Sequence, residues 1–327
     1  MTPGAAPNAS TLLPAWLHSR WLLSASLGVA CLVLAAAWGF MAYERRELEE
    51  NATEQGALYA RVLEDHANRT FNAVDLAMGA ALEATRLQRG AGLDLQLSPM
   101  LQQSVQALPY LRSISLLDAQ GWVLASSSPA NVGLQMRQAD LLPPPATSGL
   151  GPLLPGRDLA ELAALPAGAQ AQAHAGAQLL PLMMPLQDGA GSAWLLVTIN
   201  PDYFANQYTL LLQDTRLTAS LMSYGGQLLV PAAGSRHAAG TWLKTHPLFA
   251  QAVQAGREHG QWQTPGLQGE PVFMAWRTAR RLPLVVVVET PQSVPEAKLR
   301  AIGLNVAGGS LLLLLGLGAL TFVAWRS

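Results

Sequence analysis

Two long apolar runs lie near the two ends of the 327-residue chain, at residues 21–42 and 302–325. Neither run contains a charged residue, and Trp21 and Trp325 stand at their outer ends. Roughly 20 apolar residues let a helix cross a hydrocarbon core of about 30 Å, and tryptophan favours the edges of that core. The pattern therefore predicts two transmembrane helices. A cleaved signal peptide, with Ala35–Ala37 as its cleavage site, is the alternative for the first run.

A helical pattern follows the first run, over the proline-free residues 44–89. Its apolar positions recur at steps of three and four residues, which predicts one long helix with a single buried stripe. The stripe comprises Leu63, Ala67, Phe71, Val74, Met78 and Leu82. The first turns carry mostly Glu, Arg, Asn and Gln, as expected of a solvated or dimer-facing stalk. Gly90–Gly92 is the predicted end of the helix.

From residue 111 to residue 289 the pattern changes to short apolar segments separated by Gly, Pro, Asp and Asn. The first two segments, 112–117 and 123–126, flank Asp118–Gly121 and predict a hairpin with a tight turn. We expect a buried face on this hairpin formed by Ile114, Leu116, Val123 and Leu124.

A second hairpin, around Gly225–Gly226, begins the same order of hairpin, helix and strands again. The order predicts an internal repeat of architecture, while residues 134–155, rich in Pro and Gly, are predicted as loop. Strands are predicted at 179–186, 192–200, 217–224, 227–230, 258–263, 271–277 and 284–289. Helices are predicted at 98–107, 157–165, 202–212, 247–255 and 292–300. The fold class is therefore α+β.

Composition narrows the possible functions. Charged residues make up 13% of the chain and the formal net charge is −1, so no basic surface for nucleic acid is expected. Cys31, the single cysteine, lies in an apolar run, and the six histidines form no H-x-x-x-H pair. We therefore expect no disulfide, no metal and no cofactor. No phosphate-binding glycine loop, G-x-S-x-G elbow, kinase signature or cyclase signature is present, which predicts no enzymatic activity for these residues.

Four segments follow one another between the apolar runs. The first is H-x-x-R-T-F-x-A-V-D at His66–Asp75, and the second is L-R-S-I-S-L-L-D-x-x-G at Leu111–Gly121. The third is V-L-A-S-S-x-P-x-N-V-G at Val123–Gly133, and the fourth is the strand-to-helix corner at Val197–Phe204. In this order and layout they resemble the double Cache sensor domain of bacterial transmembrane receptors, and the resemblance covers nearly the whole chain.

The resemblance implies a long N-terminal helix and two PAS-like antiparallel-sheet modules, flanked by two transmembrane helices. It implies a division into a cytoplasmic tail (1–20), a transmembrane helix (21–42), a stalk and long helix (43–92), a membrane-distal module (93–213), a membrane-proximal module (214–297) and a second transmembrane helix (298–325). Residues 43–300 would lie in the periplasm and the two spans in the bacterial inner membrane.

The resemblance also implies a ligand site, because the distal module in this family often binds a small molecule between its sheet and a loop-helix cover. Members that bind amino acids tend to carry Asp near the end of the last distal strand, where this chain has Thr198. We therefore expect a neutral or anionic ligand, such as a carboxylate held by the fork of Arg112. The candidate ligand-binding residues are Tyr110, Arg112, Ser126, Ser127, Asn131 and Thr198.

Each candidate also has a purely structural interpretation. Tyr110 could be a packed aromatic residue and Arg112 a solvent-facing one, while Ser126 and Ser127 could cap the loop before a proline. His66 lies on one helix face with Arg69, where it could sense protons or simply pack at an interface.

The sequence thus predicts the ligand-sensing input region of a bacterial signal-transduction receptor of the histidine kinase, diguanylate cyclase or chemoreceptor type. It would act as a homodimer through Glu44–Asp65, and its cytoplasmic output would either lie beyond Ser327 or be a separate polypeptide. One alternative is a two-span inner-membrane assembly protein of the polysaccharide co-polymerase type, which would carry long charged helices instead of two small sheets. A membrane-anchored hydrolase is the other.

Overall fold

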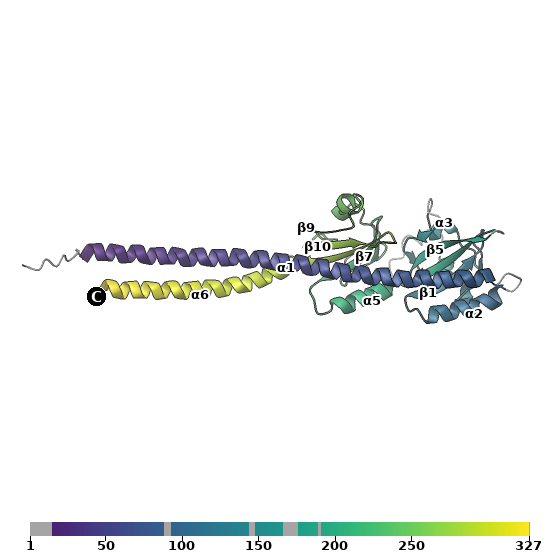
Figure 1. Ribbon diagram of the computed structural model, residues 1–327, viewed down its shortest axis with the longest axis horizontal. Helices are drawn as coiled ribbons and strands as arrows, with labels where there is room; N and C mark the ends of the chain where they lie inside the picture. Colours follow the sequence, from purple (N-terminus) through teal and green to yellow (C-terminus); the bar gives the residue numbers. More distant parts are fainter. Residues whose placement is uncertain (1–14, 88–92, 144–147, 166–175, 189–190, 327) are drawn as a thin grey trace, which may run out of the picture. The chain divides into compact units, whose positions relative to one another are not determined.

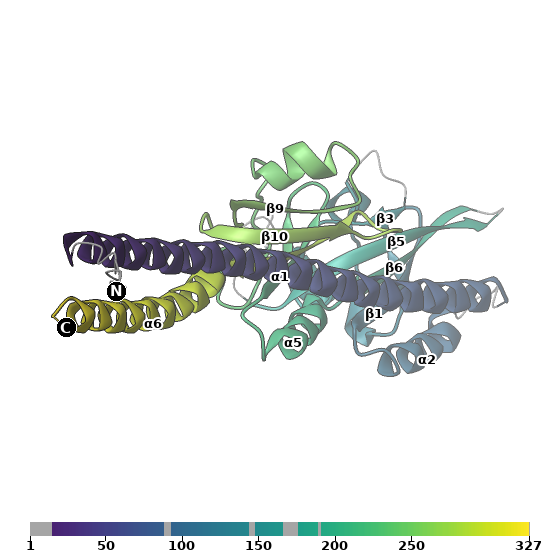
Figure 2. The ribbon, with the colours of Figure 1, turned by 60° about the vertical axis from the view of Figure 1, so that its left-hand side comes forward.

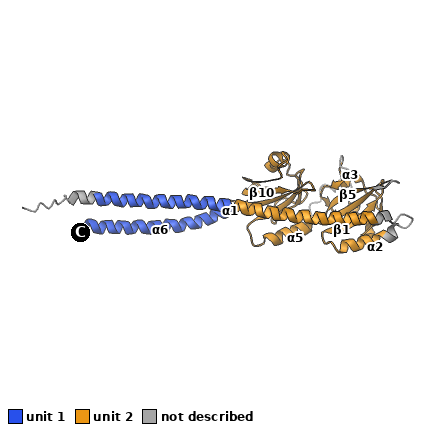
Figure 3. Cartoon of the chain, in the orientation of Figure 1, with its two compact units in different colours: residues 1–51, 293–327 blue, residues 52–292 orange. Residues whose placement is uncertain are grey.

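The computed structural model describes residues 15–87, 93–143, 148–165, 176–188 and 191–326. The chain divides into two compact units, residues 1–51 with 293–327 and residues 52–292, which Figure 3 distinguishes by colour. The predicted helix end at Gly90–Gly92 falls outside the described residues.

The first unit consists of two apolar helices. The helix α1 (Ala15–Leu87) begins in this unit, and α6 (Ser293–Arg326) supplies its second helix. Their most apolar windows have mean hydropathies of 2.0 and 2.1, and 0% of either window is buried within the protein. Both helices are therefore long and apolar enough to cross a membrane, as the sequence predicted.

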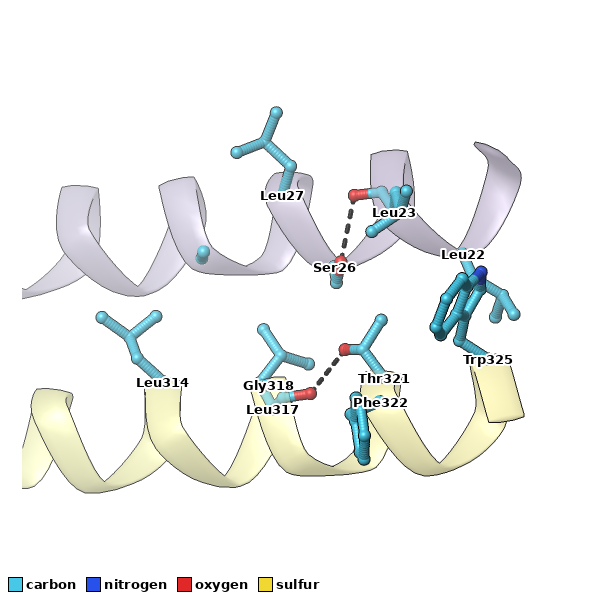
Figure 4. A pocket seen from close by; sticks show the side chains of 11 residues that line it. Leu22, Leu23, Ser26, Leu27, Leu314, Leu317, Gly318, Thr321, Phe322 and Trp325 are labelled. Carbon is cyan, nitrogen blue, oxygen red and sulfur yellow. Dashed lines mark hydrogen bonds between the residues drawn. The ribbon is translucent and has the colours of Figure 1, made fainter. Parts of the chain in front are cut away.

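A groove of about 650 Å³ lies between these two helices. Figure 4 shows its apolar lining, which includes Leu27, Leu314 and Trp325. Lipid chains or another helix can fill an apolar groove of this kind in a bilayer, so the groove by itself identifies no ligand.

The second unit contains two antiparallel sheets, as predicted, each forming one module (Figure 1). The strand order in the first module is β2-β1-β6-β5-β3, with β4 paired to β5. Its strands are β1 (Leu111–Leu117), β2 (Val123–Ser126), β3 (Gly149–Leu150), β4 (Leu154–Pro155), β5 (Gln178–Asp188) and β6 (Gly191–Ile199). The strands β3 and β4 lie in the stretch predicted as loop. They are two residues long, too short to show a sequence period, and exist through pairing with β5.

The first module is covered on both faces. Leu101 of α2 and Ile114 of the sheet belong to one buried apolar cluster, which also contains residues of α1, on what we call the helix face. Leu141 and Leu162 join Leu196 of the sheet in a second cluster, on what we call the cover face. The covering elements are α2 (Leu93–Gln106) on the helix face, and η1 (Pro129–Asn131), α3 (Gln138–Leu141) and α4 (Leu159–Ala164) on the cover face.

The predicted stripe of α1 is buried along both modules. Leu63, Ala67, Val74 and Met78 are 0% exposed and Phe71 is 4% exposed, whereas Leu82, at the end of the stripe, is only partly buried. The same apolar cluster contains residues of both sheets, and Figure 2 shows α1 passing along them. The three- and four-residue spacing therefore does select the buried face of the helix.

The hairpin of β1 and β2 forms as predicted, but its four apolar residues do not share one buried face. Leu124 is 40% exposed, so the expectation that it is buried is wrong. Ile114 and Leu116 contribute to the helix face, whereas Val123 contributes to the cover face. Because successive strand residues point to opposite faces, Val123 and Leu124 cannot share one buried face.

Gly121 makes the turn of this hairpin possible. It has a φ of +84°, and a Cβ there would collide with the carbonyl oxygen of Met136. We expect Gly121→Ala to lower the free energy of unfolding by about 2 kcal/mol, from left-handed strain plus overpacking. Gly133→Ala is the matched control, since Gly133 has a φ of +79° but a Cβ there would meet no atom of the described residues within 4 Å. Thermal unfolding of both variants should give a clearly larger loss for Gly121→Ala, and equal losses would contradict the collision.

The second module has the strand order β8-β7-β11-β10-β9. The helix α5 (Pro201–Leu212) precedes this sheet in the sequence. The elements of the module are β7 (Thr218–Ser223), β8 (Leu228–Val230), the π-helix η3 (Leu248–Val253), β9 (His259–Pro265), β10 (Pro271–Thr278) and β11 (Leu284–Pro291). Val285 and Val287 face one apolar cluster while Val286 and Val288 face the other. The run of valines in β11 therefore indicates a strand that is buried on both faces.

Candidate ligand site

Four small polar residues form a buried patch on the cover face of the first module. The Ser113 hydroxyl lies 2.7 Å from that of Thr198, and the Ser115 hydroxyl lies 2.8 Å from that of Ser126. None of these four residues is more than 1% exposed. They share the face because alternate residues of β1, here Ser113 and Ser115, point the same way and stand opposite β6 and β2.

Asn131, at the end of η1, closes this patch. Its side-chain nitrogen donates weak hydrogen bonds to Ser113 Oγ at 3.4 Å and Ser126 Oγ at 3.5 Å. Its oxygen accepts a hydrogen bond from the backbone nitrogen of Ala160 in α4, at 3.1 Å. With 0% of its surface exposed, Asn131 ties the sheet to the covering elements.

The serine run at the end of β2 makes its own hydrogen bonds within the chain. Ser127 Oγ accepts from the backbone nitrogen of Ile114 at 2.9 Å. Ser126 Oγ accepts from the backbone nitrogen of Ser128 at 3.1 Å, and Ser128 Oγ donates to Asp158 Oδ2 at 3.4 Å. Asp158 also caps α4 by accepting from Glu161 N at 3.0 Å. These serines therefore fix the cover to the sheet.

Arg112 lies at an irregularity of β1, since the register with β6 shifts between Leu111 and Ser113. Such a bulge re-aims the side chain. Its Nη2 donates to Asn200 Oδ1 at 2.7 Å and to Asp202 Oδ2 at 3.2 Å, and the side chain is 14% exposed. The interpretation of Arg112 as a solvent-facing residue is therefore wrong.

Arg112 has a counter-ion but keeps one unpaired donor among the described residues. Burial lowers the pKa of the Arg112 guanidinium, and Asp202 opposes that effect. Its Nε is buried and has no hydrogen-bond partner among the residues that the structure describes. Arg112 therefore keeps an unused donor beside a carboxylate that is itself mostly exposed, at 68%.

Tyr110 lies apart from the polar patch. Its ring belongs to the helix-face cluster and meets Tyr203 edge-on, with the ring centroids 5.5 Å apart. The structure thus brings Ser126, Asn131 and Thr198 together but places Tyr110 on the opposite side of the sheet.

An aromatic cluster joins α1 to α5, and the sequence reasoning missed it. Phe204 lies 5.6 Å from Phe71 and 6.5 Å from Tyr208, while His66 stacks on Tyr203 at 5.7 Å, measured between ring centroids. Phe204 and Tyr208 are four residues apart in the sequence, so they lie on one face of α5, and this spacing could have predicted an aromatic contact surface on that helix. Burial raises the pKa of the Tyr208 phenol and lowers the pKa of His66. His66 is therefore a packed histidine that favours its neutral form.

No group of three or more His, Cys, Asp or Glu within the described ranges could hold a metal ion.

No protein-family model matches this sequence, and no curated protein matches it either. Solved structures match its fold. The extracellular domain of rpHK1S-Z16, a protein assigned to the histidine kinases, is 18% identical with a TM-score of 0.57 over 75% of this chain and 96% of that one. The periplasmic sensory domain of the Campylobacter jejuni chemoreceptor Tlp1 is 13% identical with a TM-score of 0.54 over 76% and 98%.

The ligand-binding domain of the Pseudomonas fluorescens chemoreceptor CtaA, solved with L-isoleucine, is 12% identical with a TM-score of 0.53 over 78% of this chain and 98% of that one. At such identities the likeness concerns the fold. The fold of this chain is that of the extracytoplasmic sensory domains of bacterial receptors, which confirms the predicted double-module architecture.

Proposed function

We propose that this chain is the extracytoplasmic input region of a bacterial transmembrane receptor and that it responds to a small molecule. The observation that carries the proposal is the sensory-domain fold of residues 52–292, placed in the sequence between two membrane-length apolar helices. α1 runs without interruption from the first apolar run into the sheets, and β11 is followed directly by α6. A ligand that binds two arrangements of the sheets unequally would therefore shift the ends of the membrane helices.

The two antiparallel sheets favour this function over the assembly protein, for which long charged helices were expected. We infer a position in the bacterial inner membrane, with residues 43–300 in the periplasm. A histidine kinase, a diguanylate cyclase or a chemotaxis domain would be the corresponding output.

The ligand site we propose is the cover face around Arg112 and the patch of Ser126, Asn131 and Thr198. CtaA was solved with the amino acids isoleucine, alanine and leucine. In this chain the end of β6 offers the Thr198 hydroxyl, already bonded to Ser113, in place of a carboxylate that could hold an ammonium group. A carboxylate ligand could instead replace Asp202 on Arg112 and use its free Nε.

Thermal unfolding of the full chain in detergent micelles tests this site with propionate, pyruvate, succinate and L-alanine. We expect one of the carboxylates to raise the melting temperature saturably, because about 100 Kd of ligand contributes about 2.7 kcal/mol to stability. Arg112→Ala should abolish the shift. Arg137→Ala, which removes an exposed arginine paired with Asp140 at 2.8 Å in the same module, should retain it. An equal shift in the two variants would exclude Arg112 from the site, and turnover of a carboxylate without any shift would support an enzyme.

We further propose that the receptor is a homodimer through Glu44–Asp65. Single cysteines introduced along this stretch, in a Cys31→Ser background, should crosslink with yields that repeat every three to four residues. Yields without that period would contradict a helical dimer contact.

A further inference from the structure

A polar cleft of about 620 Å³ lies in the second unit, between α1 and the connection from β10 to β11. The wall formed by α1 includes Arg61 and Arg69, and the opposite wall includes Arg277, Arg280 and Arg281. The two carboxylates that line it are Glu64 and Asp65, so five guanidinium groups face two acidic side chains. This cleft is separate from the cover face of the first module.

Both lining carboxylates are already engaged. Glu64, whose side chain is 7% exposed, accepts from Arg277 Nε at 2.8 Å through Oε2 and from Asn68 Nδ2 at 2.7 Å through Oε1. Asp65 pairs with Arg69 at 2.7 Å. Each lining carboxylate therefore already has one arginine partner, which leaves a surplus of positive charge in the cleft.

Arg281 has partners of its own, which are neither Glu64 nor Asp65. Its Nη1 lies 3.2 Å from Asp75 Oδ2 and donates to Asn72 Oδ1 at 3.3 Å. A third guanidinium is thus fixed at the cleft by its own counter-ion.

Arg61 and Arg280 are left without a counter-ion. Within the part of the chain that the structure describes, neither side chain makes an ion pair or a hydrogen bond, and the two stand on opposite walls of the cleft. The Nη groups of Arg277 likewise have no hydrogen-bond partner in these ranges, although Glu64 fixes the guanidinium through Nε. Guanidinium groups stay charged at all physiological pH values and present paired donors that match oxyanions.

We propose that this cleft binds a multivalent oxyanion, one bearing several phosphate or carboxylate groups, between Arg61 of α1 and Arg280 of the β10–β11 connection. Arg277 supplies further donors from a position fixed by Glu64. A bound anion would join α1 to the connection that leads into β11, the strand preceding α6. The bound anion would therefore stabilise the receptor state in which α1 and the β10–β11 connection lie close together.

Isothermal titration calorimetry on the full chain in micelles tests the site, with pyrophosphate and citrate as probes at fixed ionic strength. We expect saturable binding of at least one probe, and the tighter probe identifies the class as polyphosphate or polycarboxylate. Arg61→Ala and Arg280→Ala should each weaken binding about tenfold, the loss of one charged hydrogen-bonding partner. The charge reversal Arg280→Glu should abolish it. These two arginines have no partners to lose among the described residues, so the variants should fold.

Two controls separate this site from other effects. Arg236→Ala removes an exposed arginine that pairs with Glu270 at 3.3 Å in the same module, and it should bind the probe like the parent chain. Arg112→Ala should also bind it normally, because the inference does not depend on the ligand proposed for the first module. No saturable binding, or equal binding by Arg236→Ala and the Arg61→Ala/Arg280→Ala double variant, would overturn the proposal.

Discussion

Phe204→Ala is expected to lower the free energy of unfolding by about 3–5 kcal/mol, the cost of replacing a fully buried aromatic side chain by a methyl group. Phe204 is 1% exposed and lies at the centre of the cluster that joins α1 to α5. Its ring faces Phe71 at 5.6 Å, Tyr203 at 5.7 Å and His66 at 6.1 Å, measured between ring centroids. Truncation would leave a cavity between α1 and α5, the two helices that this cluster joins.

Thermal unfolding in micelles measures this effect as a fall in melting temperature of about 10 °C, given the usual 2–4 °C per kcal/mol for a domain of this size. Leu210→Ala on the same helix is the matched control. Leu210 is 59% exposed, so its truncation should change stability by about 0.5 kcal/mol or less. Similar losses for the two variants would mean that the cluster does not hold α1 and α5 together.

Arg277→Ala is expected to cost about 3 kcal/mol, because it leaves the Glu64 carboxylate buried with only Asn68 as its partner. The expected cost is at the lower end for a broken buried pair, since the Arg277 side chain is 26% exposed and water can reach part of the site. Glu64 is in α1 and Arg277 is in β10, so the pair fixes the long helix to the second sheet.

A double-variant cycle isolates this interaction. Adding Glu64→Gln to Arg277→Ala removes the stranded charge, so the double variant should be more stable than Arg277→Ala alone. Arg236→Ala breaks an exposed pair, with side chains 75% and 64% exposed, and should cost no more than about 1 kcal/mol. Additive losses from Glu64→Gln and Arg277→Ala would show that the pair contributes no coupling energy.

The sequence by itself determined most of the elements of this protein, but it missed α3, β3 and β4, which lie in residues 134–155 that were predicted as loop. The spacing of Leu63 to Met78 selects the buried side of α1, the charge-free runs select the membrane-length helices, and Gly121 selects the turn of the first hairpin. These features depend on neighbours within a few residues, through helical period, strand alternation and backbone conformation. Ser126 and Thr198 became candidates through the resemblance to sensor domains, and the strand pairing, a tertiary feature, places them on one face of the sheet.

Only the tertiary structure decided which groups meet. Arg112 pairs with Asp202, which is 90 positions away in the sequence, and Glu64 pairs with Arg277, which is 213 positions away. Neither pairing leaves a periodic signal. The side of the sheet that receives Tyr110, the exposure of Leu124 and the cleft with Arg61 and Arg280 on facing walls follow from strand register and from the packing of α1 on both sheets. Long-range packing is chosen by the fit of whole surfaces, whereas local sequence patterns describe one surface at a time.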